Sequence, residues 1–137
     1  FKLSSIKSDI IALIQPTTPY RFSNDLTLMI NKFKSLKEAD SLITVRQLTR
    51  ARGKVINGYW HKESQNISNI SSLKSDNILY EATGHLILLR PTKTLDLGSL
   101  LGENIVTELL PYNWPDIDID TKYDWEIANK FTYTDSI

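Results

Sequence analysis

Residues 9–16 read DIIALIQP, a short apolar run that a proline ends. Its five apolar side chains follow one another without polar alternation, so a strand built from them is apolar on both faces. Strands of that kind are typical of a parallel sheet that helices cover on both sides. We therefore expect a buried strand in an α/β domain whose sheet is mostly parallel.

The residues that follow complete a β-α-β unit. Residues 23–25 (Ser-Asn-Asp) offer N-cap side chains, and apolar residues recur at helical spacing over 26–36. A second β-branched strand is expected over 40–45. The crossover between two such strands is right-handed as a rule, and this favours a Rossmann-like arrangement.

Later elements are shorter. We expect strands over 85–90 and 105–110 and a short helix over 97–101. Residues 116–120 alternate with period two, which predicts an extended segment. Residues 121–124 (Thr-Lys-Tyr-Asp) resemble a capping box, so a closing helix should begin there.

Residues 46–77 differ from the rest because they are polar and rich in Ser and Asn. A hairpin is expected around 55–60, next to the aromatic pair Tyr59-Trp60. Long insertions of this kind are usually functional or interfacial, and exposed aromatic side chains favour an interface, with a local satellite core as the alternative. Without an internal repeat, we predict one domain over 1–137 with 46–77 as an arm.

Composition narrows the classes of function. The 137 residues suffice for one domain with a core, and sixteen basic residues balance sixteen acidic ones. This balance gives no electrostatic reason to expect a nucleic acid or a membrane surface as partner. No cysteine is present, which excludes a thiolate metal site and suits a cytoplasmic location. No apolar run approaches the ~20 residues of a membrane span.

The first group of candidate site residues lies in 15–21, QPTTPYR, where the buried strand ends. Ligands of open α/β sheets bind outside the carboxyl ends of strands. Gln15 offers a bidentate amide, Thr17 and Thr18 offer hydroxyls, and the fork of Arg21 suits carboxylate or phosphate. A proline-rich connector with a surface arginine is the plainer interpretation.

The second group is Asp118 and Asp120. Side chains two apart on an extended segment project from the same face, and a hard cation relieves the repulsion between their carboxylates. Magnesium takes one or two protein carboxylates together with substrate phosphate oxygens and waters. The alternative is an Asp-rich turn whose charges complement the helix that follows.

The third group precedes the strand at 85–90 and contains Glu81, Thr83 and Gly84. Gly84 would allow a ligand to approach the backbone closely, although a simple turn explains it as well. His61 and His85 have no partners at metal-ligand spacing, and we interpret each as a core or surface histidine rather than a catalytic one.

The order of the three groups resembles that of the CMP-acylneuraminate (sialic acid type) cytidylyltransferases. The sequence QPTTPYR is similar to their Gln-Pro-Thr-Ser-Pro-Leu-Arg motif, and DIDIDT at 116–121, followed by Asp124, is similar to their last motif. Tyr80-Glu81 with Gly84 before a strand is also similar. Thr83-Gly84 replaces the Asn-Gly of the family, which leaves the sugar selectivity open.

The resemblance implies a Rossmann-like nucleotide-diphospho-sugar transferase fold that forms a homodimer through residues 46–77. It implies transfer of CMP from CTP to a nonulosonic sugar acid with release of pyrophosphate. Asp118 and Asp120 would hold Mg²⁺ as catalytic residues. The substrates would meet Gln15, Thr17, Thr18, Arg21, Glu81, Thr83 and Gly84.

The family's Arg-Gly-Gly-Ser-Lys type loop, which grips CTP, has no counterpart in the chain. We therefore expect that the N-terminal part of the fold is missing here and that these residues are inactive alone. Two alternatives remain open. One is a non-catalytic dimerisation or binding remnant of the fold. The other is a metal-dependent glycosyltransferase, in which a longer acceptor-binding region normally follows the Asp pair.

Overall fold

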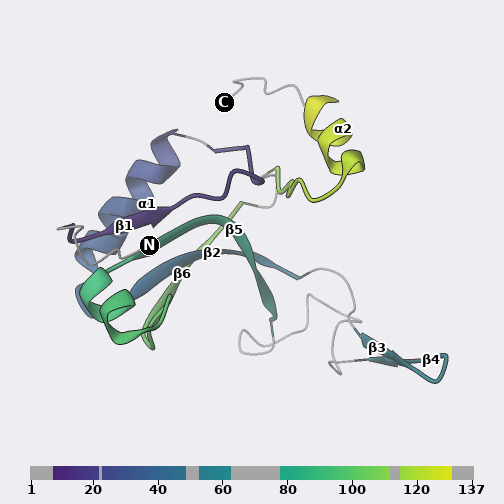
Figure 1. Ribbon diagram of the computed structural model, residues 1–137, viewed down its shortest axis with the longest axis horizontal. Helices are drawn as coiled ribbons and strands as arrows, with labels where there is room; N and C mark the ends of the chain where they lie inside the picture. Colours follow the sequence, from purple (N-terminus) through teal and green to yellow (C-terminus); the bar gives the residue numbers. More distant parts are fainter. Residues whose placement is uncertain (1–7, 22, 49–52, 63–77, 112–114, 131–137) are drawn as a thin grey trace.

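A computed structural model describes residues 8–21, 23–48, 53–62, 78–111 and 115–130. Its centre is a four-stranded sheet with helix α1 (Ser23–Ser35) on one face (Figure 1). The strand order is β1-β5-β2-β6, with bounds Ile11–Leu13, Tyr80–Leu89, Ser41–Gln47 and Ile105–Leu109. The domain is thus α/β, as the sequence predicted.

The sheet is mixed, and the prediction of a mostly parallel sheet is wrong. Strand β5 runs antiparallel to both β1 and β2, and among the described strands only β2 and β6 form a parallel pair. Strands β1 and β2 do run in the same direction on either side of α1. However, β5 begins only at Tyr80 and enters the sheet between them, and the β-α-β pattern carries no information about a strand so much later in the chain.

Strand β1 also differs from the sequence interpretation. It is a three-residue strand at one margin of the sheet and pairs only with β5 among the described strands. Ala12, Leu13 and Ile14 are exposed rather than buried. The unbroken apolar run predicted an interior position, but its burial depends on neighbours that the run itself does not specify.

The core lies between α1 and the sheet. Phe33 of α1 is fully buried against Leu42 of β2 and Leu88 of β5. Arg90 covers Phe33, since its guanidinium carbon lies 4.2 Å from the ring centroid and its nitrogens donate to the carbonyl oxygens of Phe33 and Ala39. Arg90 thereby ties the end of α1 to the residues that lead into β2.

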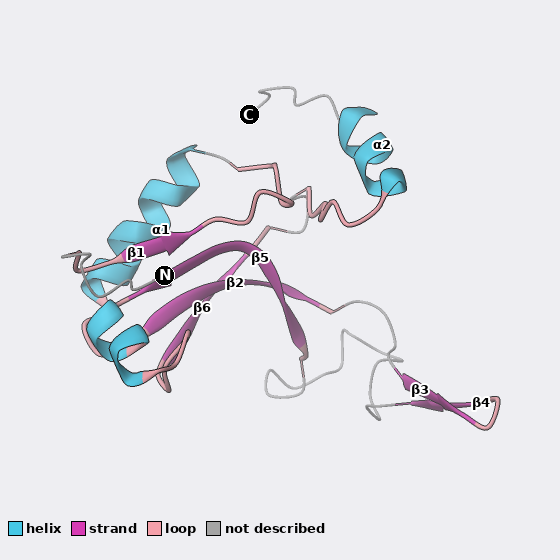
Figure 2. Cartoon of the chain, in the orientation of Figure 1, coloured by secondary structure: helices cyan, strands magenta, loops and turns pink. Residues whose placement is uncertain are grey.

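The hairpin expected around 55–60 is confirmed. Strands β3 (Gly53–Ile56) and β4 (Tyr59–Lys62) are joined by Asn57 and Gly58. Both turn residues have positive φ, 51° and 84°, as a type I′ turn requires, and Asn-Gly is the preferred dipeptide for it. The hairpin lies apart from the main sheet (Figure 2).

Two other local predictions have opposite outcomes. The capping box is confirmed: Thr121 Oγ1 accepts from the backbone N–H of Asp124, and Asp124 accepts from that of Thr121, at the start of α2 (Lys122–Lys130). The prediction of a short helix at 97–101 is wrong, because the structure has the 3₁₀ turns η4 (Pro91–Lys93) and η5 (Leu95–Leu97), which lie almost entirely before those residues. The left-handed backbone of Gly98 ends them.

Strand β6 agrees with the strand expected at 105–110 to within one residue, whereas β5 begins five residues before the expected 85–90. In the part of the chain that the structure describes, no helix has the length and apolarity that crossing a bilayer needs.

Asp40 joins the start of β2 to the segment that leads into β6. Its Oδ2 accepts from the backbone N–H groups of Glu103 and Asn104, each at 3.0 Å. These two bonds hold the pKa of Asp40 below its ordinary value, because they stabilise the charged form.

We predict that Asp40→Asn lowers the urea midpoint at neutral pH. A carboxylate whose pKa is depressed on folding contributes stability above its unfolded pKa, and that contribution is lost as the pH falls through the folded pKa. The difference between wild type and variant should therefore shrink at acid pH in urea titrations. Exposed Asp96 provides the control as Asp96→Asn. An equal difference at neutral and acid pH would contradict the role of the charge.

Candidate functional site

The Gln15 loop (residues 15–21) is held in shape by Arg21. One guanidinium nitrogen, Nη2, donates to the Gln15 carbonyl at 2.5 Å and to Thr18 Oγ1 at 2.7 Å. The Nε atom donates to the carbonyl of His85 in β5 at 3.3 Å. Partial burial lowers the pKa of Arg21, yet a guanidinium stays charged. Arg21 therefore orients the loop and fastens it to the sheet.

Strand β5 is irregular beside that loop. The register with β2 changes between Ile43, which faces Ile87, and Val45, which faces Ala82, so that β5 carries extra residues there. We call residues 83–86 the β5 bulge. Bulges re-aim side chains and are frequent next to active sites.

The hydroxyl of Thr44 replaces the missing ladder bonds of the β5 bulge. It accepts from the backbone N–H of Leu86 at 3.2 Å and from Thr83 Oγ1 at 2.8 Å. Thr44 is almost completely buried, so these bonds satisfy polar groups that cannot reach water.

The β5 bulge places Gly84 against Gln15. Gly84 has φ = 68°, and a Cβ added to it would lie 3.0 Å from the Gln15 side-chain carbon Cδ. The Gln15 amide thus lies directly on the Gly84 backbone. The first and third predicted groups, which are about seventy residues apart in sequence, meet here.

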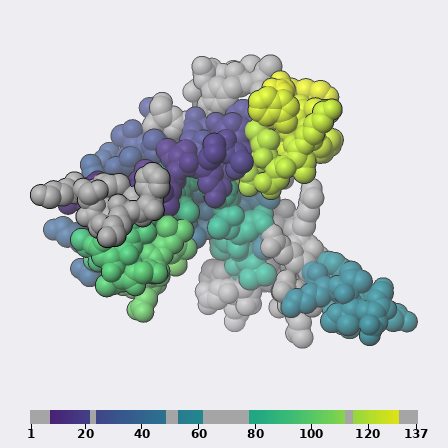
Figure 3. All heavy atoms as spheres, in the orientation of Figure 1, coloured from purple at the N-terminus to yellow at the C-terminus, as the bar shows by residue number. Residues whose placement is uncertain are grey.

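The segment that carries Asp118 and Asp120 lies next to the Gln15 loop. The backbone N–H of Ile119 donates to the Thr17 carbonyl at 2.8 Å. Figure 3 shows the purple residues of the Gln15 loop beside the yellow-green C-terminal residues. All three predicted groups therefore lie at the carboxyl ends of β1 and β2.

Asp118 and Asp120 are not placed on a regular strand. The backbone N–H of Asp120 donates to the Asp118 carbonyl at 3.2 Å, which closes a three-residue turn. Both side chains are exposed, and no basic side chain of the described residues forms an ion pair with either.

This pair of carboxylates would supply only part of a magnesium site, so phosphate oxygens of a substrate would have to supply other ligands. Within the described ranges no three His, Asp or Glu side chains form a metal-binding group. Two exposed carboxylates without a cationic partner match the small protein share of a typical magnesium site, with phosphate oxygens and waters as the other ligands.

Sequence reasoning missed Arg46 and Asp116. Arg46, at the end of β2, donates from Nε to Glu81 Oε1 at 2.5 Å and pairs through Nη1 with Asp116 Oδ2. The only signals in the sequence were a charged residue at the end of an apolar strand and an additional Asp in the 116–120 alternation.

His85 is buried, as a structural histidine should be. Its Nδ1 lies 3.1 Å from the Thr83 carbonyl and 3.6 Å from Asp116 Oδ1. Burial lowers the pKa of His85 and outweighs the nearby Asp116 charge, which acts in the opposite direction. The ring is therefore mainly neutral near pH 7.

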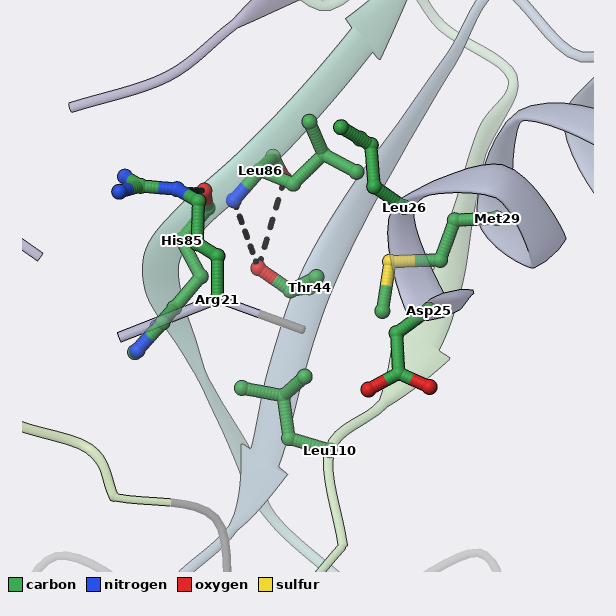
Figure 4. Close-up of a pocket in the computed structure, with 8 residues that line it drawn as sticks. All are labelled: Arg21, Asp25, Leu26, Met29, Thr44, His85, Leu86 and Leu110. Carbon is green, nitrogen blue, oxygen red and sulfur yellow. Dashed lines mark hydrogen bonds between the residues drawn. The ribbon is translucent and has the colours of Figure 1, made fainter. Parts of the chain in front are cut away.

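A small cavity of about 20 Å³ lies between Arg21, His85 and α1 (Figure 4). Its lining is mainly apolar, with Leu26, Met29, Leu86 and Leu110. That volume accommodates one water rather than a substrate. A wider, open depression of about 730 Å³ lies at the other end of the sheet and contains none of the predicted residues. The candidate site is thus the surface over the Gln15 loop and Gly84.

The polar groups of three other predicted residues, Thr18, Thr83 and Glu81, bond to neighbouring residues of the fold. Thr18 and Thr83 are buried, with their hydroxyls bonded to the Gln15 carbonyl and to Thr44, and Glu81 pairs with Arg46. Substrate contacts by these three stay predictions. Gln15 and Gly84, by contrast, lie together at the surface.

Comparison of the chain with models of known protein families and with curated proteins finds no match.

We predict that Gly84→Ala destabilises the fold by about 1–2 kcal/mol through its left-handed backbone, and further through contact with Gln15. Gly98→Ala is the matched control, because Gly98 has a similar φ of 76° and open space around it. Urea unfolding should show the larger loss at Gly84, and Gln15→Ala should remove the excess. Equal losses at the two glycines would contradict the Gln15–Gly84 contact.

Proposed function

We propose that this chain forms part of a cytidylyltransferase that transfers CMP from CTP to a nonulosonic sugar acid, within a Rossmann-like nucleotide-diphospho-sugar transferase fold. The observation that carries the proposal is the meeting of the Gln15 loop, Gly84 and the Asp118–Asp120 segment at the carboxyl ends of β1 and β2. These are the three segments on which the resemblance in sequence rests. As an enzyme that uses CTP, it would act in the cytoplasm.

In this proposal Gln15 and Gly84 form the substrate-binding surface. The exposed amide of Gln15 donates to and accepts from sugar or nucleotide groups, and the missing side chain of Gly84 leaves the room that this amide occupies. Arg21 holds the loop in place rather than binding the substrate with its Nη2. Thr17 contributes its carbonyl to position Ile119.

Asp118 and Asp120 would hold magnesium, which supplies positive charge that offsets the charge of the triphosphate. In the reaction that the resemblance implies, the anomeric oxygen of the sugar bonds to the α-phosphorus of CTP. The bond from that phosphorus to the bridging oxygen breaks, pyrophosphate leaves, and the hydroxyl proton passes to water. The protein's share is orientation of the reactants.

A non-catalytic binding remnant is the second candidate. The internal bonds of Arg21, Glu81 and Thr83 favour it, because they leave fewer polar groups for a substrate. The two candidates differ in whether turnover is measurable.

We predict pyrophosphate release when the complete protein meets CTP, Mg²⁺ and one member of a panel of nonulosonic acids. Asp118→Asn and Asp120→Asn should each reduce the rate by at least roughly a hundredfold, because the ion loses a charged ligand. Asp96→Asn is the control. A folded protein that releases no pyrophosphate with any acid would favour the non-catalytic candidate, and unchanged rates in the variants would remove both Asp residues from the site.

We also propose that the β3–β4 hairpin binds a second copy of the chain. Val55 faces Trp60 across the hairpin and Ile56 faces Tyr59, so both faces of the ribbon are apolar. Val55 is 68% exposed and Tyr59 is 75% exposed. An isolated two-stranded ribbon is marginally stable in water, and a partner that covers its apolar residues would stabilise it.

The double variant Ile56→Ser, Tyr59→Ser should shift the protein from dimer to monomer in analytical ultracentrifugation. Trp60 is left in place because its ring packs on the Gly53 backbone and supports the hairpin. Leu97→Ser, which alters a single exposed side chain far from the hairpin, is the control. A dimer of unchanged affinity would exclude this surface.

A further inference from the structure

The C-terminal segment (residues 115–130) is attached to the sheet mainly by polar contacts. Helix α2 has no buried residue, and Tyr123 is 70% exposed. The Ile119 N–H donates to the Thr17 carbonyl, and Tyr20 Oη donates to the Ala128 carbonyl at 2.6 Å. A segment with little apolar burial has a low free energy of local opening, so each polar contact has a large effect on its position.

The third attachment is made by Asp116, which pairs with Arg46 through Oδ2 and has His85 Nδ1 at 3.6 Å from Oδ1. The Arg46 guanidinium lies between Glu81 of β5 and Asp116 of the C-terminal segment, with a different nitrogen for each carboxylate. Asp116 and Ile119 are thus both fixed, and Asp118 lies between them. The arrangement determines where the Asp118 carboxylate stands relative to the Gln15 loop.

We propose that Arg46 is a positioning residue that docks the C-terminal segment, and with it Asp118 and Asp120, beside the Gln15 loop. Glu81 contributes to the docking as well, because its ion pair with Arg46 orients the guanidinium toward Asp116. The proposed use of Asp118 and Asp120 as magnesium ligands rests on the proposed function. The docking itself rests only on the contacts named above.

The chemistry of the side chain supports arginine in this position. A planar fork offers two separate nitrogens to two carboxylates, whereas the single ammonium of lysine cannot keep the same geometry. Exposed ion pairs contribute little to global stability. The effect of Arg46 should therefore be local, confined to residues near 115–130 and absent from the core around Phe33.

Hydrogen exchange on the folded protein tests the proposal. In Arg46→Gln, the Ile119 amide should exchange roughly three- to tenfold faster than in wild type, as expected when a marginally held segment loses an ionic contact. Core amides of β2 and β5 should keep their rates, which shows that the variant is folded. Lys32→Gln is the matched control, because it breaks the exposed pair between Lys32 of α1 and Glu108 of β6 without touching the segment.

Two further variants separate docking from a general charge effect. Arg46→Lys should give an intermediate exchange rate, and Asp116→Asn should raise the Ile119 rate about as much as Arg46→Gln does. An Ile119 rate that is unchanged in Arg46→Gln, or one that rises equally in Lys32→Gln, would overturn the proposal.

Mn²⁺ as a paramagnetic probe separates this inference from the proposed function. If Mn²⁺ broadens the NMR signals of Asp118 and Asp120 more strongly in wild type than in Arg46→Gln, Arg46 positions these two residues as metal ligands. If Mn²⁺ broadens neither residue in wild type, the magnesium site fails, whereas the exchange rates of Ile119 still decide whether Arg46 docks the segment.

Discussion

The buried hydroxyl of Thr44 is the interaction on which the candidate site depends. It completes the hydrogen bonds of β2 and β5 where β5 carries extra residues, and so makes the bulge at 83–86 stable. The bulge turns Gly84 toward Gln15 and sets the His85 carbonyl where Arg21 reaches it. A regular β5 would place neither group beside the Gln15 loop.

The candidate site combines a rigid part with a loosely attached part. The rigid part is the Gln15 loop on the sheet, tied internally by Arg21 and Thr18. The loosely attached part is the C-terminal segment, which buries little apolar surface and carries the exposed carboxylates. This division would suit the proposed charged substrates, because a segment of low local stability can adjust while the sheet does not.

The motifs at 15–21, 81–84 and 116–120 indicated a common site from their residue types and from the position of the first at a strand end. Their convergence agrees with that interpretation. The buried positions of Thr18 and Thr83 were not foreseeable, because a hydroxyl suits a ligand and a neighbouring strand equally well. Arg46 was overlooked because nothing local connects it with Asp116, seventy residues away.

The sequence by itself determined the elements that depend on near neighbours in the chain. The Asn57-Gly58 turn, the capping box of Thr121 and Asp124, and the apolar face of α1 that buries Phe33 all follow from backbone preference and periodicity over a few residues. Only the tertiary structure decided that β5 lies antiparallel between β1 and β2, and which charges face each other across the site. The reason is that strand order is set by contacts between distant segments, which no local pattern records.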